Sequence, residues 1–345
     1  MNVLTIAGNV TSRWLLGAVV VCVAIGVISM RSWTSAATEP AEIMEAQPAE
    51  SNEPIQPIES IANLDPRKVS LGQKLFGDPR LSHDNQISCA TCHLFRNGGA
   101  DGRARSIGIH GSVGVINAPT VLNSGFNFSQ FWDGRANTLE KQIEGPIQSN
   151  IEMGSTWAEV VAKLSRDPEY VRDFSRIYSD GVQREHVKDS IAEYERSLST
   201  PNSRFDRYLR HDTQALSQEE QEGYRLFKSL GCASCHQGAG VGGNMYQKMG
   251  VIIPYFVEGP HASPADQGRF NVTGDPRDRY MFKVPSLRNV ALTAPYFHNG
   301  SAATLDEAVR TMGKYQLGRP LTEQQVESIV AFLRALTGQL NGKQL

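Results

Sequence analysis

The chain has 345 residues, of which 40% are hydrophobic and 20% charged, and its formal net charge is −2 at pH 7. This composition is typical of a globular protein and excludes a collagenous chain, a disordered chain and a polytopic membrane protein. The charge offers no basic surface for nucleic acid, so we expect no nucleic-acid partner. The length exceeds what one compact core usually serves, so we expect two domains.

Residues 1–31 contain an apolar run, 14–30, which Arg13 precedes and Arg31 closes. Such a run is a signal peptide or a short membrane anchor, and its length is at the lower limit for spanning a bilayer. The residues that follow form a poor cleavage site, which favours an anchor. Cys22, within the run, is interpreted as a small membrane residue.

Residues 32–61 form an acidic, proline-rich segment. They contain four prolines and six glutamates but neither Lys nor Arg. A segment of this composition cannot bury a core, so we expect a flexible linker.

Two motifs of identical spacing follow: Cys89-Ala-Thr-Cys92-His93 and Cys232-Ala-Ser-Cys235-His236. A CxxC pair alone is also compatible with a disulfide or another metal site, but the adjacent His is typical of covalent haem attachment. Both sulfurs of a motif can reach the vinyl groups of one porphyrin, and the His then faces the iron. The sequence therefore predicts two covalently bound haems c, with His93 and His236 as proximal iron ligands.

The chain also contains a weak internal repeat. Residues 71–76 (LGQKLF) precede the first motif and residues 223–227 (GYRLF) precede the second. We therefore predict two cytochrome c-like haem domains, at 62–205 and 206–345.

Helix starts are recognisable as capping boxes, at Thr156–Glu159, Ser217–Glu220, Thr304–Glu307 and Thr322–Gln325. The last box should open a helix with one apolar face, formed by Val326, Ile329, Val330, Leu333 and Leu336. Alternation typical of strands is scarce, and the stretches 96–135 and 238–303 are interpreted as ordered loops around cofactors. The predicted fold class is all-α: two cytochrome c-like domains with long ordered loops, preceded by the N-terminal anchor or signal.

Several longer motifs resemble the bacterial dihaem cytochrome c peroxidases over roughly residues 61–340. They are Asn117-Ala-Pro-Thr120, Gln130-Phe-Trp-Asp-Gly-Arg-Ala136, Leu139-Glu-Lys-Gln142, Gly145-Pro146, Glu152-Met153, Val284-Pro-Ser-Leu-Arg-Asn289, Thr293-Ala-Pro-Tyr-Phe-His-Asn-Gly300 and Met312-Gly-Lys-Tyr-Gln-Leu-Gly318. The resemblance implies an oxidoreductase in the periplasm that reduces hydrogen peroxide to water. Its electrons would come from a small cytochrome c or a cupredoxin. It also implies a homodimer, here with a tether to the inner membrane.

The resemblance assigns roles to individual residues. His93 would hold the low-potential haem that reacts with peroxide, and His236 with Met312 would hold the high-potential haem that receives electrons. Trp132 would lie between the haems. Glu152 would be the acid/base group, beside Gln142 in the same pocket.

Two implied sites are less direct. Asn117, with the backbone carbonyls of Thr293 and Pro295, would bind one calcium ion. His110 lies where related proteins keep a distal His that ligates the low-potential iron before activation. The loop after His110 is one residue shorter than expected, so an always-open pocket is an equal alternative.

Each role has a simpler alternative. Met312 could be core filler, with Met245, Met249 and Met281 as rival iron ligands. Trp132 could be an ordinary core aromatic, and Glu152 a helix cap.

Two other functions remain alternatives. One is a dihaem oxidase that acts on a protein side chain, similar to MauG, where the resemblance predicts Tyr in place of Met312. The other is a non-catalytic electron-transfer protein, which should lack a carboxylate such as Glu152.

Overall fold

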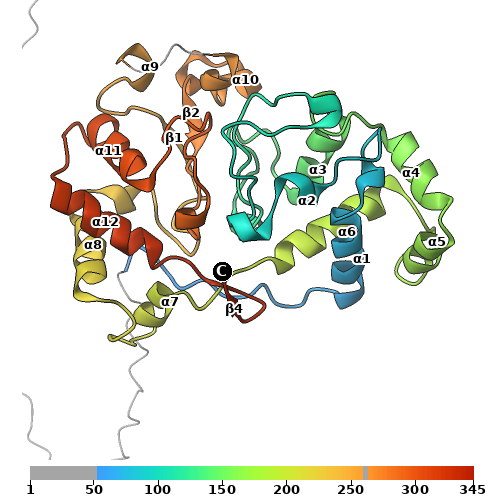
Figure 1. The fold of residues 1–345 in the computed structure, drawn as a ribbon, viewed down its shortest axis with the longest axis horizontal. Helices are drawn as coiled ribbons and strands as arrows, with labels where there is room; N and C mark the ends of the chain where they lie inside the picture. Colours follow the sequence, from blue (N-terminus) through green and yellow to red (C-terminus); the bar gives the residue numbers. More distant parts are fainter. Residues whose placement is uncertain (1–52, 259–262) are drawn as a thin grey trace, which may run out of the picture. The chain divides into compact units, whose positions relative to one another are not determined.

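The computed structural model describes residues 53–258 and 263–345 (Figure 1). The predicted signal or anchor, including residues 14–30, and the predicted linker up to residue 52 lie outside the described residues. Within the described ranges, no helix is long and apolar enough to cross a bilayer.

The first group of helices carries the first CxxCH motif. We call it the N-terminal lobe. Its helices are α1 (Pro66–Phe76), α2 (Cys89–Cys92), α3 (Leu139–Gln148), α4 (Trp157–Ser165), α5 (Pro168–Ser175) and α6 (Arg184–Ser197).

The second group carries the second motif, and we call it the C-terminal lobe. Its helices are α7 (Arg204–Leu209), α8 (Gln218–Ser229), α9 (Tyr255–Glu258), α10 (Phe270–Thr273), α11 (Leu305–Tyr315) and α12 (Glu323–Arg334). Two short antiparallel pairs of strands accompany them: β1 (Tyr246–Lys248) with β2 (Met281–Lys283), and β3 (Gln339–Leu340) with β4 (Lys343–Gln344). The described chain is thus mostly helical, as predicted, and these two strand pairs are an addition to the all-α expectation.

All four predicted helix starts are confirmed, since Thr156, Ser217, Thr304 and Thr322 each accept a backbone N–H three residues on. The reciprocal bond forms in the last three. At Thr156 it does not, because Glu159 instead contacts His83 and Lys163. The contact of Glu159 with His83 thus takes the place of one of the two hydrogen bonds of this capping box.

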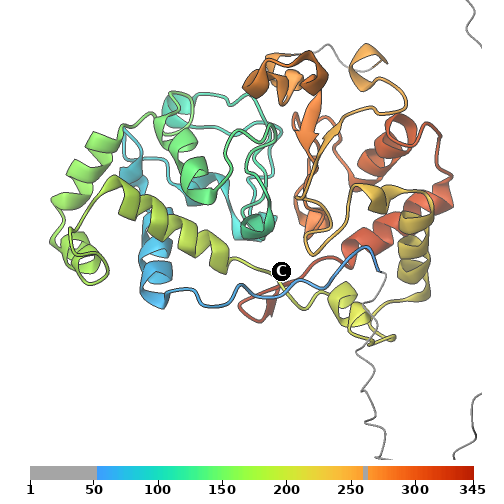
Figure 2. The same ribbon diagram turned by 180° about the vertical axis from the view of Figure 1, so that it is seen from behind.

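Each lobe is built on a crossing of two helices at a glycine. Helix α1 lies beside α6, and α8 beside α12 (Figures 1 and 2). A Cβ added to Gly72 would lie 1.9 Å from the carbonyl oxygen of Ser190, and one added to Gly223 would lie 1.9 Å from that of Ser328. Only glycine allows backbones to approach this closely.

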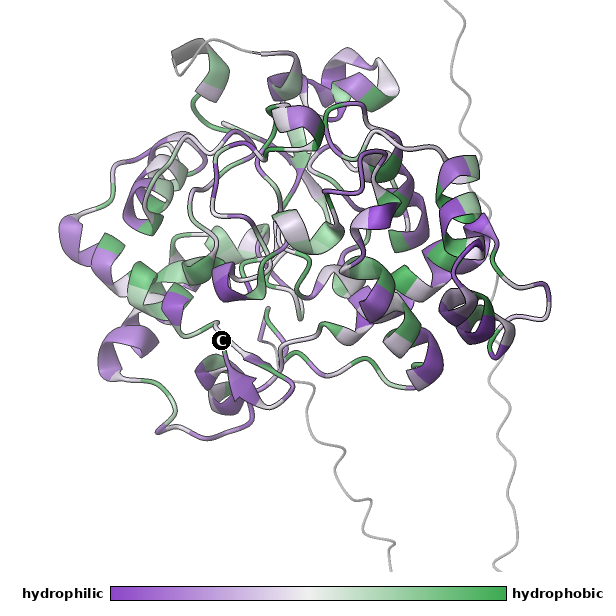
Figure 3. Ribbon diagram, turned by 45° about the vertical axis from the view of Figure 1, so that its right-hand side comes forward, coloured by the Kyte–Doolittle hydropathy of each residue, from purple (hydrophilic) through white to green (hydrophobic). Residues whose placement is uncertain are grey.

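Apolar residues alternate with polar ones along the helices, which Figure 3 shows as green and purple segments. The apolar residues form one core between residues 71 and 198 and another from Ile55 together with residues between 205 and 336. The predicted apolar face of α12 is confirmed, because all five of its residues are buried.

The end of the predicted linker is packed. Ile55 and Ile58 are buried, and Ile55 belongs to the C-terminal core. The backbone N–H of Ile58 donates to Asp206 Oδ1 at 3.0 Å, and Arg288 donates to the carbonyl of Gln56. Residues 53–61 therefore differ from the flexible chain expected from their composition, because a buried polar network fixes their backbone.

Candidate haem sites and the residues between them

A cavity of about 690 Å³ is lined mainly by the N-terminal lobe, including the first CxxCH motif, and on one side by residues 263–282 of the C-terminal lobe. We call it the N-terminal cavity. Cys89, Cys92 and His93 all face it, and neither cysteine forms a disulfide. A cavity of this size falls within the range of cofactor sites. Its thiols and imidazole are the groups that hold a c-type haem, so the residues fit the predicted cofactor.

His93 is held in the orientation of an iron ligand. Its Nδ1 lies 3.0 Å from the carbonyl oxygen of Gly99, so Nδ1–H donates there and Nε2 is left for the metal. A second bond of this kind fixes the tautomer of a ligating His. Burial lowers the pKa of His93, which keeps the imidazole neutral and able to bind a metal.

The predicted catalytic residues line the same cavity. Gln142 and Pro146 lie on α3, and Glu152 lies in the turn after it. Burial raises the pKa of Glu152, while a hydrogen bond from Ser149 and the charge of Arg135 oppose the rise. The structure thus brings together Trp132, Gln142 and Glu152 on the walls of one cavity that also contains His93.

His110 is not among the residues that line this cavity. Its side chain is 69% exposed, and its Nδ1 lies 3.8 Å from Asp84 Oδ2. The preceding Gly108 packs so closely that a Cβ would lie 2.2 Å from the carbonyl of Ile151. The backbone N–H of Ile109 donates to the carbonyl of Glu152 at 2.8 Å. The loop that carries His110 is therefore bound to the backbone of Glu152, while the imidazole points elsewhere.

The second CxxCH motif has the same proximal arrangement. His236 Nδ1 lies 3.3 Å from the carbonyl of Val241, and Cys232 and Cys235 are free thiols. Burial lowers the pKa of His236 to about 4, so this imidazole is neutral as well. Phe227 contacts His236 with a centroid distance of 6.3 Å, as Phe76 contacts His93.

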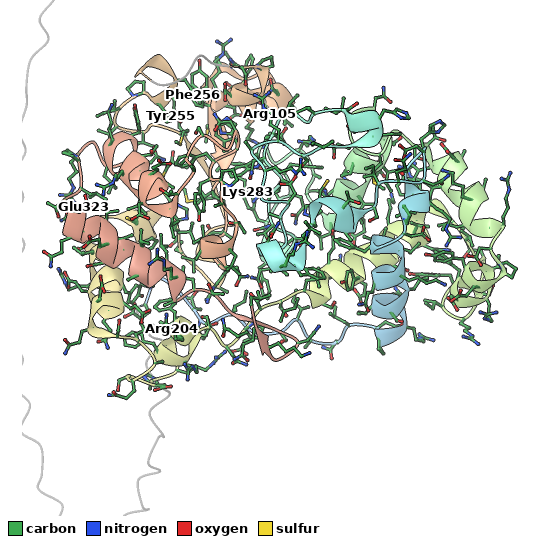
Figure 4. The ribbon with its side chains drawn as sticks, viewed as in Figure 1. Arg105, Arg204, Tyr255, Phe256, Lys283 and Glu323 are labelled. Carbon is green, nitrogen blue, oxygen red and sulfur yellow. The ribbon has the colours of Figure 1, made fainter. Side chains whose placement is uncertain are left out.

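Met312 lies in a small cluster of sulfur and aromatic side chains in the C-terminal lobe. It packs with Met249 and Phe282, together with Trp132. Tyr255 and Phe256 close the cluster, with centroids 5.1 Å apart (Figure 4). Both Met312 and its rival Met249 therefore lie near Trp132. Membership of this cluster does not identify which of the two is the iron ligand.

Trp132 belongs to the cavity wall and also to this cluster. Its indole N–H donates to the carbonyl of Asn117 at 3.0 Å, and its own carbonyl accepts from the backbone of Lys283 at 2.8 Å. Lys283 lies on β2 (Figure 4). Trp132 and Phe282 thus both connect the N-terminal cavity to the surroundings of Met312.

The residues predicted to bind calcium are only partly brought together. The Asn117 amide lies 2.8 Å from the carbonyl of Arg103 and 3.5 Å from that of Pro295. Calcium prefers amide, carbonyl and carboxylate oxygens as ligands. A 180° flip of the Asn117 amide exchanges its oxygen and nitrogen, so the oxygen could face the ion. The oxygens of Asn117, Arg103 and Pro295 fit a calcium ion. Within the described residues, no cluster of three acidic, His or Cys side chains forms a metal site.

Sequence reasoning missed two buried carboxyl groups, Asp266 and Glu195, and it placed His298 near the second haem without identifying its carboxylate partner. His298 Nε2 lies 2.5 Å from Asp266 Oδ1, and both side chains are buried. Glu195, on α6, lines the haem cavity. No motif marks Asp266, but a closer comparison of the repeat would have found Glu195. Residues 190–196 (SIAEYER) correspond to residues 328–334 (SIVAFLR), which places Glu195 opposite Leu333.

Two cytochrome c-like lobes, each with a CxxCH motif and an oriented proximal His, define a c-type dihaem protein. Residues 66–214 match the family described as di-haem cytochrome c peroxidase, and residues 220–337 match the cytochrome c family. The chain is 50% identical over 293 residues to the cytochrome c peroxidase Ccp of Escherichia coli, covering 84% of this chain and 62% of that protein. It is 49% identical over 289 residues to the cytochrome c551 peroxidase of Nitrosomonas europaea, covering 84% and 85%.

One solved structure, a MauG-like protein associated with microbial copper homeostasis, matches with a TM-score of 0.72 and 31% identity. The match covers 85% of this chain and 95% of that protein. The chain belongs to the dihaem cytochrome c peroxidase family. This membership confirms the predicted oxidoreductase class and the two c-type haems.

Proposed function

We propose that the N-terminal cavity reduces hydrogen peroxide to two molecules of water, using two protons and two electrons. The observation that carries this proposal is the position of Glu152, a half-buried carboxyl on the wall of the cavity that contains His93. A haem held by Cys89, Cys92 and His93 supplies redox-active iron to this cavity.

Glu152 performs the proton transfer. Peroxide reduction needs a proton to leave one oxygen and reach the other, and a carboxyl with a raised pKa can accept and return it. Gln142 and Pro146 shape the cavity around the substrate.

Electrons enter at the C-terminal haem, which His236 and Met312 hold. A thioether ligand raises the potential of a c-type haem, so this haem accepts electrons readily. Trp132 lies on the route to the N-terminal cavity, because it contacts both regions. The donor is a small cytochrome c or a cupredoxin.

The exposed position of His110 supports the open-pocket alternative, in which peroxide reaches the first haem without prior release of a distal ligand. Asn117, Thr293 and Pro295 hold one calcium ion. Its role is to fix the Asn117 carbonyl against the Trp132 indole.

The protein works in the periplasm as a homodimer, and residues 14–30 tether it to the inner membrane. This part of the proposal rests on the apolar run and on the family. The linker of residues 32–52 would then determine how far the folded part can lie from the membrane.

The substitution Glu152→Gln tests the function. It keeps the size of the side chain but removes proton transfer, so peroxide turnover should fall by about 10²–10⁴ while both haem spectra and thermal stability are kept. Glu144→Gln is the matched control, because Glu144 lies on α3 and pairs with Arg184 and Lys188. Its turnover should not change.

Turnover by Glu152→Gln within about threefold of the parent would remove Glu152 from the mechanism, since threefold is under 1 kcal/mol of barrier. Failure of the parent enzyme to consume peroxide would favour one of the two alternatives. An oxidase acting on a protein side chain is disfavoured by Met312, where the resemblance predicts Tyr in that class.

A further inference from the structure

Glu195 is a buried carboxyl that the proposed chemistry does not use. It is 5% exposed, it lines the N-terminal cavity, and its Oε2 has no hydrogen-bond partner among the described residues. Ser124 lines the same cavity, and its Oγ is likewise buried without a partner. Native proteins rarely leave such groups unsatisfied, so two of them in one cavity require an explanation.

The two groups lie on adjacent elements. The short turn of residues 124–126 packs against α6, and a Cβ on Gly125 would lie 3.4 Å from the Cα of Arg196. Gln130 donates to the carbonyl of Ser124 at 3.0 Å and fixes the turn. Glu195 and Ser124 are thus two polar groups on adjacent elements of an otherwise largely apolar cavity, and their unpartnered oxygens do not hydrogen-bond to each other.

The fold does not need a carboxyl at this position. Gly72 faces Ser190 and Tyr194 of α6 as Gly223 faces Ser328 and Phe332 of α12, with the same distances of 1.9 and 2.8 Å. This correspondence places Glu195 at the position of Leu333, which is buried in the C-terminal core. An apolar residue therefore satisfies the same helix crossing in the other lobe.

No neighbouring cation neutralises Glu195. Arg196 forms ion pairs with Glu140 and Glu193 instead. Lysines of the packed helices are paired with other carboxylates: Lys68 with Asp189, Lys74 with Glu169 and Asp173, Lys163 with Glu159, and Lys188 with Glu144 and Glu185. Lys141 of α3 is exposed to solvent.

The remaining titratable and charged groups that face the cavity belong to other walls. They are Cys89, Cys92, His93, Arg105, Asp133, Arg135 and Glu152. Cys89 is a haem attachment site and lies on α2. Figure 1 labels both α2 and α6. Burial raises the pKa of Glu195 to about 8, so the carboxyl is protonated at neutral pH.

We propose that Glu195, assisted by Ser124, is a proton-binding site coupled to electron entry into the N-terminal haem cavity. A haem held by Cys89, Cys92 and His93 would accept one electron from the donor. Above neutral pH, where Glu195 is a carboxylate before reduction, one proton would pass from solvent hydronium to this carboxylate, so that an O–H bond of hydronium breaks and an O–H bond of the carboxyl forms. The proposal rests on the presence of a haem in this cavity and not on the role of Glu152.

The physical reason is the low dielectric of the site. Charges interact much more strongly in a buried cavity than in water, so a change of one charge at the cofactor shifts the proton affinity of a carboxyl on the same wall. An added electron makes the cavity more negative and raises this affinity. Electron and proton uptake then favour one another, as linkage requires.

A redox titration of the holoprotein at a series of pH values tests the coupling. Around pH 8, where Glu195 titrates, the midpoint potential of the N-terminal haem should fall as pH rises. The limiting slope is about 59 mV per pH unit, the one-electron equivalent of a tenfold change. Glu195→Gln keeps the size of the side chain but cannot titrate, so this slope should be lost.

Two controls identify the group. Glu185→Gln changes an exposed carboxyl on the same helix and should keep the slope. Glu152→Gln should also keep it, although this variant should lose turnover. A slope that survives Glu195→Gln but is lost in Glu152→Gln would overturn the proposal and leave the proposed function intact.

Infrared difference spectra of reduced minus oxidised protein give a second readout. Above pH 8, where Glu195 is ionised before reduction, a carboxylic acid C=O band should appear on reduction, shift in Ser124→Ala and be missing in Glu195→Gln. A band that is unchanged in Glu195→Gln would also overturn the proposal. If Glu195→Gln does not fold, Glu195→Leu takes its place, because its side chain cannot titrate either, and a slope or a band that survives in it would overturn the proposal.

Discussion

The two lobes share one means of holding a haem and differ in what surrounds it. Both cross two helices at a glycine, both place a Phe ring 6.3 Å from the proximal His, and both fix the His Nδ1 on a backbone carbonyl. The N-terminal lobe adds a cavity with two carboxyls of raised pKa, Glu152 and Glu195. The C-terminal lobe has Met312 among aromatic rings.

This difference shows where function is encoded. The shared features hold the cofactor on its proximal side, so they constrain the fold but not the chemistry. The carboxyls of one lobe and the thioether of the other lie outside this shared frame. On the proposed function, the same frame would support peroxide chemistry in one lobe and electron entry in the other.

The largest expected effect is at the shared crossing. Gly72→Ala and Gly223→Ala each place a Cβ 1.9 Å from a backbone carbonyl, which only a separation of the two helices can relieve. We expect each to cost about 3 kcal/mol of stability or more, at the upper end for overpacking. Thermal unfolding of the holoproteins measures this cost.

Gly77→Ala is the control for these two variants. The nearest atoms to its Cβ would be 3.9 Å away, and its φ is −88°. It should be neutral or stabilise by about 0.4–1 kcal/mol. A Gly72→Ala variant as stable as the parent, beside a damaged Gly223→Ala variant, would mean that the two lobes do not share the crossing.

The next effect concerns Glu195 in folding. Its folded pKa of about 8 lies above its ordinary value of 4.5, so the folded state binds one proton more than the unfolded state between these values. Stability therefore falls as pH rises through this window. Glu195→Leu, which copies the C-terminal lobe, should remove this fall.

The gain of Glu195→Leu over the parent should grow with pH and reach about 1–3 kcal/mol, the cost of an unsatisfied buried polar group. Denaturant unfolding below pH 4.5 and above pH 8 measures it. Glu185→Leu, on the exposed face of α6, is the control and should show no such trend. A gain that does not depend on pH would mean that Glu195 is ionised in the folded protein.

Met312→His should bring the two haems closer in potential. A nitrogen ligand stabilises ferric iron relative to a thioether, so the potential of the C-terminal haem should fall by at least about 60 mV, a tenfold change in the one-electron equilibrium. Met249→Leu is the matched control in the same cluster, since it conserves volume. The reverse pattern, with only Met249→Leu moving the potential, would assign the ligand to Met249.

Local chemistry made much of this molecule predictable. The haem motifs, the caps at Thr156, Ser217, Thr304 and Thr322 and the apolar face of α12 depend on residues close in sequence, and all are present. The cavity that gathers Trp132, Gln142 and Glu152 was reached through the family resemblance, because these residues meet only in three dimensions.

The features that the sequence did not reveal depend on distant partners. Glu159 does not complete its capping box because it contacts His83, which is 76 residues away in the sequence. Asp266 contacts His298, which is 32 residues away. Residues 53–61 are fixed by Asp206 and Arg288, which no composition argument could identify. Glu195 was detectable, because the repeat places a carboxyl where its other copy has Leu333.

The smallest expected effect is at His110. It concerns whether an added ligand such as cyanide can reach the iron of the N-terminal haem. His110 has a left-handed φ of 55° and an exposed side chain, so His110→Asn should keep the backbone, because Asn tolerates this conformation. Cyanide should bind the resting, oxidised variant with an affinity within about twofold of the parent, which is under 0.5 kcal/mol. The affinity is measured by optical titration before any reduction.

Asp84→Asn is the companion variant, because Asp84 is the group nearest to the exposed His110 imidazole, and it should also leave cyanide binding unchanged. If the parent binds cyanide only after reduction while His110→Asn binds it at once, His110 ligates the iron of the resting enzyme. The N-terminal lobe would then resemble the C-terminal lobe in having a protein ligand on both sides of its iron. The two lobes would then differ in the ligands of their irons only after reduction. The cavity around Glu152 would become accessible only after an electron had entered.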